Sequence, residues 1–202
     1  MRKITCSIIS FALYCSTSIL GQALTPATQA FKRGGAEYLK GNYPVAETLF
    51  QQAAQLDPAM IDAHEYLGHT LFKRERYREA IPVFLNTLKL DSKRVLPLAH
   101  RRVVIDELGM AYGISGDLQT AKAHFETAIR DDPDYPMFYY NLACANGEMG
   151  DLEPVLMNLH AAFQRKQNLN QYETMPNPAT DDSFRRFVQN ARFKQFLQDI
   201  QR

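Results

Sequence analysis

Residues 41–50 of the chain read GNYPVAETLF, and residues 56–58 read LDP. Glycine ends helices readily, because it adopts the left-handed conformation at a helix C-terminus without steric cost. The Asp57-Pro58 pair ends a helix for a different reason, since proline lacks a backbone donor and disfavours the helical conformation in the residue before it. The stretch therefore predicts a turn, a short helix and a second turn.

The same pattern recurs along the chain with a period of 34 residues, as from Gly34 to Gly68. The first unit carries Gly34, Ala46, Phe50, Ala53 and Pro58. The matching positions of the later units are Gly68, Ala80, Phe84, Thr87 and Ser92; Gly109, Ala121, Phe125, Ala128 and Pro133; and Ala143, Val155, Leu159, Ala162 and Gln167. Turn residues recur in the same phase at 41–43, 75–77, 116–118 and 150–152. Because one helix pair cannot bury its own apolar face, the period predicts stacked helix pairs.

These residues closely resemble the tetratricopeptide repeat, above all in the run at 41–50 followed by Leu56-Asp57-Pro58. The last unit, with YNLAC at 140–144 and GDL at 150–152, resembles the terminal repeat of many exported bacterial members. The resemblance covers four repeats, at 27–60, 61–94, 102–135 and 136–169. It implies an all-α fold, a right-handed superhelix (α-solenoid) of antiparallel helix pairs, and a function in protein binding. Repeat four departs from the pattern with Val155 and Leu159 in place of alanine and an aromatic residue.

Residues 95–101 interrupt the period between repeats two and three. Seven residues turn a helix by nearly two whole turns, about 20° short. The insertion can therefore lengthen the first helix of repeat three without rotating its buried face, with Pro97 in the first turn. A longer loop is the alternative.

The first 23 residues read as a cleavable export signal. Arg2 and Lys3 precede a mostly apolar run at 4–20, and Gly21 and Ala23 stand at the positions that a signal peptidase reads. We expect a mature chain from Leu24, periplasmic or extracellular, with no membrane attachment. Retention of the segment as an anchor is the alternative.

The C-terminal region, 170–202, reads as a linker followed by a helical cap. A polar connection with two prolines runs over 167–180. Asp182 or Ser183 is then expected to cap a short helix, and Asn190 a second one. The apolar residues of the two helices are Phe184, Phe187 and Val188, then Phe193, Phe196, Leu197 and Ile200. Repeat arrays need such an element to cover their last apolar face.

Charge and motif content argue against nucleic-acid binding and catalysis. The net charge is +1, and loss of the two basic signal residues gives 21 − 22 = −1, so no basic face for nucleic acid is expected. His64 and His69 are five residues apart, not the four of a helical zinc motif, and so lie on different faces. Cys144 has no histidine placed beside it in the sequence. We predict no catalytic residue, no metal and no cofactor, with a cysteine- or metal-dependent hydrolase as the weakest alternative.

The resemblance places four positions of each first helix on an inner wall. The partner-binding residues predicted there are Phe31, Tyr38, Asp62, Glu65, His69, Phe72, Asp106, Met110, Met137 and Tyr140. The acids should gather, because Glu65 lies one turn after Asp62 and Asp106 holds the equivalent position of the next repeat. The positions with which some members hold a peptide's terminal carboxylate carry no basic residue here.

Such a wall would suit a peptide with Lys or Arg beside apolar anchors. The sequence thus predicts a non-enzymatic scaffold that binds a protein or peptide partner on its concave face. For the apolar wall residues, packing within the array is the alternative. For the function, a structural part of a cell-envelope assembly, using the edges of the array or the extension at 95–101, is the alternative.

Overall fold

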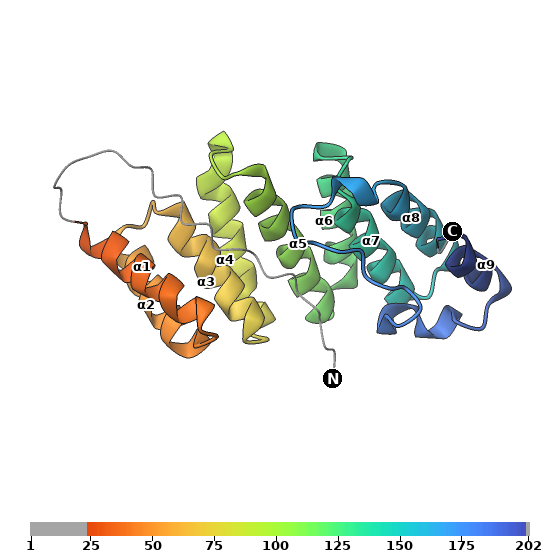
Figure 1. Ribbon diagram of the computed structural model, residues 1–202, viewed down its shortest axis with the longest axis horizontal. Helices are drawn as coiled ribbons and strands as arrows, with labels where there is room; N and C mark the ends of the chain where they lie inside the picture. The colour runs from red at the N-terminus through yellow and green to blue at the C-terminus, as the bar shows by residue number, and fades with distance from the viewer. Residues whose placement is uncertain (1–23, 201–202) are drawn as a thin grey trace. The chain divides into compact units, whose positions relative to one another are not determined.

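The computed structural model describes residues 24–200, and this part of the chain is all-α (Figure 1). The expected export signal lies outside the described residues. The elements are α1 (Pro26–Leu39), α2 (Tyr43–Leu56), α3 (Ile61–Lys73), α4 (Tyr77–Leu90), η1 (Asp91–Lys93), α5 (Leu98–Ile114), α6 (Leu118–Asp131), α7 (Pro136–Met149), α8 (Leu152–Gln164), η2 (Lys166–Asn168), η3 (Asp182–Phe187) and α9 (Ala191–Asp199). The predicted fold class, an all-α solenoid of helix pairs, is confirmed.

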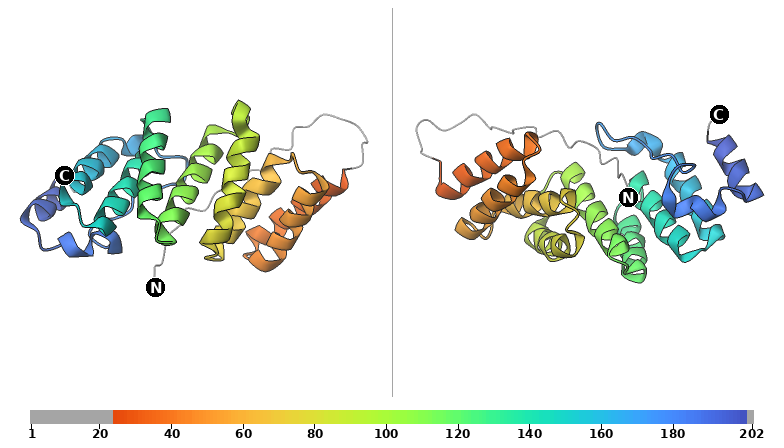
Figure 2. Two further views of the ribbon diagram at one scale, coloured as in Figure 1. Left: turned by 180° about the vertical axis from the view of Figure 1, so that it is seen from behind. Right: turned by 90° about the horizontal axis from the view of Figure 1, so that it is seen from below.

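The described residues form two compact units, 24–111 and 112–200, which divide within α5. In the first unit α1 packs on α2, α2 on α3, and α3 on α4. In the second unit α6 packs on α7 and α7 on α8, and the cap elements η3 and α9 pack on α7 and α8 respectively. The two helices of each of these pairs lie side by side (Figure 2).

Close approach within the first two pairs depends on a glycine facing a phenylalanine. A Cβ atom at Gly34 would lie 2.8 Å from the Phe50 ring, and one at Gly68 would lie 2.4 Å from the Phe84 ring. Both rings are fully buried. The period of small and aromatic residues therefore encodes how closely the two helices of each pair pack.

The turns within the pairs have the predicted left-handed residue. Gly41, Gly116 and Gly150 have φ values of 75°, 95° and 89°. In repeat two the same place is taken by Glu75, with φ of 58°. A residue with a Cβ atom is strained in this region, so repeat two folds against a local cost that the other three avoid.

The insertion between repeats two and three is divided between a connection and the helix. α5 begins at Leu98, so four of the seven inserted residues extend it, while 95–97 form the connection. The added turn is fixed by Arg101, which forms an ion pair with the fully buried Asp91. Asp91 Oδ1 also accepts a hydrogen bond from Leu96 N at 2.8 Å. Residues 98–101 thus form the first turn of α5, and Pro97, expected in that turn, lies just before it.

The C-terminal region forms two short helices, η3 and α9, and one expected cap residue needs correction. Asn190 caps α9 by accepting hydrogen bonds from the backbone N–H groups of residues 192 and 193. The 3-10 helix η3 is capped by Asp181, not by Asp182 or Ser183, because Asp181 Oδ1 accepts from Ser183 N at 2.9 Å. The buried cluster under the cap combines residues of α7, α8, η3 and α9: Tyr140, Ala143, Val155, Leu156, Leu159, Ala162, Phe184, Phe187, Phe193 and Phe196.

Candidate functional site

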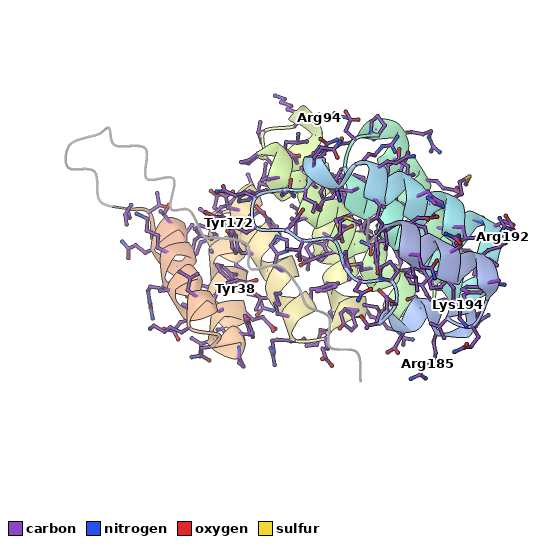
Figure 3. All side chains as sticks on the ribbon, turned by 45° about the vertical axis from the view of Figure 1, so that its right-hand side comes forward. Tyr38, Arg94, Tyr172, Arg185, Arg192 and Lys194 are labelled. Atoms are coloured by element: carbon purple, nitrogen blue, oxygen red, sulfur yellow. The ribbon has the colours of Figure 1, made fainter. Side chains whose placement is uncertain are left out.

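The wall of the first unit begins with an aromatic group on α1 and α3. The Tyr66 ring centroid lies 5.7 Å from that of Phe31 and 5.9 Å from that of Tyr38, both with edge-to-face geometry. Phe31 and Tyr38 are half-buried, and Tyr38 is labelled in Figure 3. Offset and edge-to-face aromatic pairs stabilise beyond their buried area, by about 0.5–1.5 kcal/mol each. Two of the predicted wall residues, Phe31 and Tyr38, are therefore half-buried rings that pack against a third ring.

Behind this group lies a buried chain of histidines and glutamates joining α3 to α5. His69 Nδ1 is 2.6 Å from Glu107 Oε2, and His69 Nε2 is 3.4 Å from Glu65 Oε1. His100 Nδ1, on the added turn of α5, donates to the same Glu65 oxygen at 2.8 Å. His69 and Glu65 are each only 1% exposed. Because both His69 nitrogens face carboxylate oxygens, the ring is an imidazolium that donates on both sides.

The electrostatic environment within this histidine–glutamate network favours the ionised forms of its side chains. Burial alone would lower the pKa of His69, but the charge of Glu107 and the hydrogen bonds to both glutamates raise it. Burial alone would raise the pKa of Glu65, but the hydrogen bonds from His100 and His69 lower it to about 2. The hydrogen bond to Glu65 likewise raises the pKa of His100. The cluster is a network of ion pairs. One of its atoms, Glu65 Oε2, is buried and has no hydrogen-bond partner.

These contacts correct the expected placement of several site residues. Glu65, His69 and Phe72 of α3 are buried, so their side chains offer no surface to a partner, and Tyr140 of α7 is buried beneath the chain's own C-terminal region. Glu65 and His69 are buried against His100 and Glu107 of α5, two neighbours that the repeat positions do not indicate. The alternative for the apolar positions, packing within the array, is thus observed for Phe72 and Tyr140.

The remaining predicted residues of the first unit retain some exposure. Asp62 is exposed, and Asp106 and Met110 are half-buried. Partial desolvation by neighbouring side chains and the charge of Glu65 raise the pKa of Asp62, while the charge of His100 lowers it. Asp62 and Glu65 also raise the pKa of Tyr66, although burial does so more strongly. The charge of the Asp62 carboxylate therefore disfavours deprotonation of Tyr66, the ring against which Phe31 and Tyr38 pack.

The predicted wall of repeat four is covered by the chain itself. We call residues 169–183, which connect the end of repeat four to the cap, the strap. Tyr140 OH donates to Asp181 Oδ2 at 3.1 Å, and Cys144 Sγ lies 3.8 Å from the same oxygen. A Cβ atom at Gly147 would lie 2.5 Å from Ser183 O. Of the two predicted wall residues of repeat four, Tyr140 thus contacts the strap, and Met137 is half-buried.

The described residues also bear on metal binding and membrane insertion. Between 24 and 200, no group of three or more His, Cys, Asp and Glu residues is arranged to hold a metal ion. His64, which with His69 misses the spacing of a helical zinc motif by one residue, contacts Pro58 O at 3.1 Å and Asn86 at 3.3 Å. None of the described helices combines the length and the apolar character that crossing a bilayer requires.

Comparison with known proteins agrees with this architecture. The family model for the tetratricopeptide repeat matches residues 107–147. A search of curated proteins returned no match. The chain is therefore an all-α solenoid of helix pairs, and residues 107–147 match the tetratricopeptide repeat model.

Several solved structures share the fold. MamA from Desulfovibrio magneticus RS-1, from residue 41 to its end, matches with 20% identity and a TM-score of 0.62, over 70% of this chain and 76% of that one. Another MamA crystal structure matches with 17% identity and a TM-score of 0.64, over 87% and 86%. YrrB, a TPR protein with an unusual peptide-binding site, matches with 14% identity and a TM-score of 0.61, over 87% and 86%. At these identities the likeness establishes the fold alone.

Proposed function

We propose that the protein is a non-enzymatic scaffold that binds a cationic segment of a protein partner on the first-helix wall of residues 26–111. The observation that carries this proposal is an exposed carboxylate, Asp62, whose charge acts on Tyr66, the ring against which Phe31 and Tyr38 pack. Interfaces concentrate their binding energy in aromatic anchors and in charges that become desolvated together with a partner. YrrB, which has the same fold, is a peptide-binding protein, and this supports binding as the function of the class.

The charge of the site sets the chemistry of the partner. The raised pKa of Asp62 means that burial and Glu65 disfavour its ionised form more than His100 favours it. A Lys ammonium or an Arg guanidinium placed beside Asp62 would supply the missing compensation, and an apolar side chain next to it would pack on Phe31 or Tyr38. Glu65 cannot serve in the same way, because His69 and His100 already contact its carboxylate.

The buried network supports a scaffold over a hydrolase. A histidine that acts as a general base needs a nitrogen within hydrogen-bond reach of the substrate. Both nitrogens of His69 face glutamates, and the side chain is fully buried. The network instead joins α3 to the lengthened α5, so its role in the proposal is to hold the wall rigid.

Photo-crosslinking from defined positions tests the proposal. A photoreactive residue at Phe31 should capture a partner in the native cell envelope, whereas one at Thr48, exposed on the second helix of the same repeat, should not. Asp62→Lys should reduce capture from Phe31 and Asp62→Asn should reduce it less, because only lysine repels a cation. Equal capture from both positions, or capture that Asp62→Lys leaves unchanged, would refute this binding site.

Export completes the proposal and rests on the sequence of residues 1–23, with two basic residues, an apolar run and a small-residue cleavage site. We propose a periplasmic or extracellular protein that begins at Leu24. N-terminal sequencing of material from the envelope fraction decides this. Recovery of the chain with Met1 intact in washed membranes would contradict cleavage.

A second candidate function, a structural part of an envelope assembly, is favoured by one feature of the insertion. Val95 and Leu98 are 64% and 58% exposed at the start of the added turn. An assembly that used this corner would bury them. Val95→Ser with Leu98→Ser should then release the protein from a large complex on gel filtration while the Phe31 crosslink persists. An unchanged elution profile counts against the assembly.

A further inference from the structure

The strap covers the inner wall of α7. Asn168 Nδ2 donates to Asp134 O at 3.2 Å, just before α7 begins. Tyr135 OH donates to Glu173 Oε1 at 2.8 Å, and Tyr140 OH donates to Asp181 Oδ2 one turn further along. The strap therefore runs in the same direction as α7, from its start to Gly147. In Figure 1 it is the blue segment that leaves the end of α8 and returns past α7 to the cap.

The hydrogen bonds from Tyr135 and Tyr140 to the strap are of the same kind. Each of the two tyrosine hydroxyls donates to a carboxylate of the strap, and the strap contains Glu173, Asp181 and Asp182 but no Lys or Arg. Burial, followed by the charges of Cys144 and Asp181, raises the pKa of Tyr140, so this hydroxyl keeps its proton. α7 itself carries no Lys or Arg either. The wall thus recognises carboxylates through neutral donors placed on a buried face.

The strap is held at its two ends more firmly than in its middle. Near Tyr135, Asn170 N and Asn170 Nδ2 donate to the carboxylate of Glu173 at 2.9 and 3.0 Å. At the other end Asp181 caps η3. Between them Pro178 is buried and the half-buried Met175 packs against the cluster under the cap, while the exposed residues are Thr174, Asn177, Ala179 and Thr180. A segment with few buried apolar contacts opens at a lower free energy than the core beneath it.

We propose that the inner face of α7 is a second recognition surface, which the chain occupies with its own strap and which accepts an acidic, extended segment of a partner when the strap lifts. The partner would carry two carboxylates spaced as Glu173 and Asp181 are, for Tyr135 and Tyr140. This surface belongs to the unit 112–200, so the proposal does not depend on the cationic site of the other unit. A tethered segment competes at a millimolar effective concentration, which keeps the surface closed to weak ligands.

The test is binding of a labelled synthetic peptide, residues 169–184 of this chain, to the full-length protein. Glu173→Ala with Asp181→Asn should release the strap but leave the wall and the η3 cap in place, since asparagine also caps helices. Thr174→Ala with Asp182→Asn is the matched control, because it removes a charge and a side chain next to the same positions. Neither control side chain makes a hydrogen bond to α7 among the contacts of the described residues; Asp182 lies 3.8 Å from Arg185.

Two measurements decide the outcome. Hydrogen exchange over 169–180 should become faster in the released variant, with α7 and α9 still protected, and fluorescence anisotropy should show peptide binding at least about tenfold tighter than to wild type or control. Tyr135→Phe with Tyr140→Phe, added to the released variant, should abolish that gain. A peptide with Gln and Asn in place of the two acids should bind no better to the released variant than to wild type.

Three results would overturn the proposal. One is exchange in the strap that the released variant does not accelerate, because the carboxylates then do not hold it. Another is a lifted strap with no gain in peptide binding, which makes the strap a tail that only leads to the cap. The last is a released variant that dimerises while its monomer fails to bind the peptide, because the wall then accepts a strap only as part of the whole C-terminal region.

Discussion

Replacing His69 with phenylalanine tests the buried network directly. The imidazolium lies between two glutamates that are at most 4% exposed. Removing the central cation leaves both carboxylates in a nonpolar environment, and breaking a buried pair in this way costs about 3–5 kcal/mol. The cost should appear in urea unfolding at pH 6.5 as a lower midpoint with an unchanged slope. His64→Phe is the control on the same helix and should cost less than about 1 kcal/mol, because His64 is half-buried and has only neutral partners.

The pH dependence of this loss follows from the two pKa shifts. The folded pKa of His69 is raised to about 10 from an ordinary 6.5, so its contribution is complete below pH 6.5 and is lost as the pH rises through 10. The folded pKa of Glu65 is lowered to about 2 from 4.5, so its contribution is complete above pH 4.5 and is lost as the pH falls through 2. The difference between wild type and His69→Phe should therefore be greatest between pH 4.5 and 6.5 and should shrink steadily as the pH rises from 6.5 to 10.

Two results would refute this account of the network. A loss below about 1 kcal/mol at pH 6.5 would mean that the imidazolium does not compensate the glutamates. A loss of equal size at pH 5.5 and pH 9.5 would mean that the deleted ring contributes by packing and not by charge. Replacing Glu65, His69 and Glu107 together by methionine, phenylalanine and methionine should recover most of the lost stability, since well-packed apolar residues often replace a buried ion network at little cost.

Three further predictions concern the repeats and the cap. Gly68→Ala should lower the free energy of unfolding by about 1–3 kcal/mol, because the new Cβ atom would lie 2.4 Å from the Phe84 ring; an unchanged urea midpoint would contradict the close packing. Glu75→Gly should raise the melting temperature, with a gain of up to about 1 kcal/mol, because its φ of 58° suits glycine; a lower melting temperature would mean that the side chain compensates the strain. Truncation after Gln189 removes the two buried phenylalanines of α9, at about 3–5 kcal/mol each, and should cause aggregation or early melting; melting together with the full-length chain would show that α9 is dispensable.

The fold could be predicted because its determinants are local and repeated. A glycine, an aromatic residue sixteen positions later and a turn residue recur in phase, and the Gly34–Phe50 and Gly68–Phe84 contacts show what that spacing does. The cap was equally visible, since Asn190 and two phenylalanines at helical spacing suffice to predict α9. The misplaced cap of η3 differs by one residue and reflects the choice among three consecutive polar residues at 181–183.

The candidate site was less predictable because it depends on contacts between repeats. The equivalence of Glu65 and Asp106 is correct by repeat position, yet the residue that faces His69 is Glu107, one position further along α5. The contact of His100 with Glu65 arises from the added turn, which a fixed period cannot place. A signal was present, since Glu65 and His69 stand four residues apart, a complementary acid, Glu107, occurs in the next repeat, and a histidine, His100, occurs in the insertion before it. Burial of Tyr140 depends on the strap, more than thirty residues later in the sequence.

The two recognition surfaces can be told apart by their response to salt. Asp62 is exposed, so attraction of a cationic partner is screened over about 8 Å at physiological ionic strength and should weaken steadily with added salt. At the α7 wall the donors are neutral hydroxyls, and the carboxylates that they bind come from the ligand. Because neither α7 nor the strap carries a charge of opposite sign, long-range attraction is weaker there, and the affinity should change less with salt than at Asp62. Because the contrast rests on which side of each interface carries the charge, one salt series assigns a captured partner to one surface or the other.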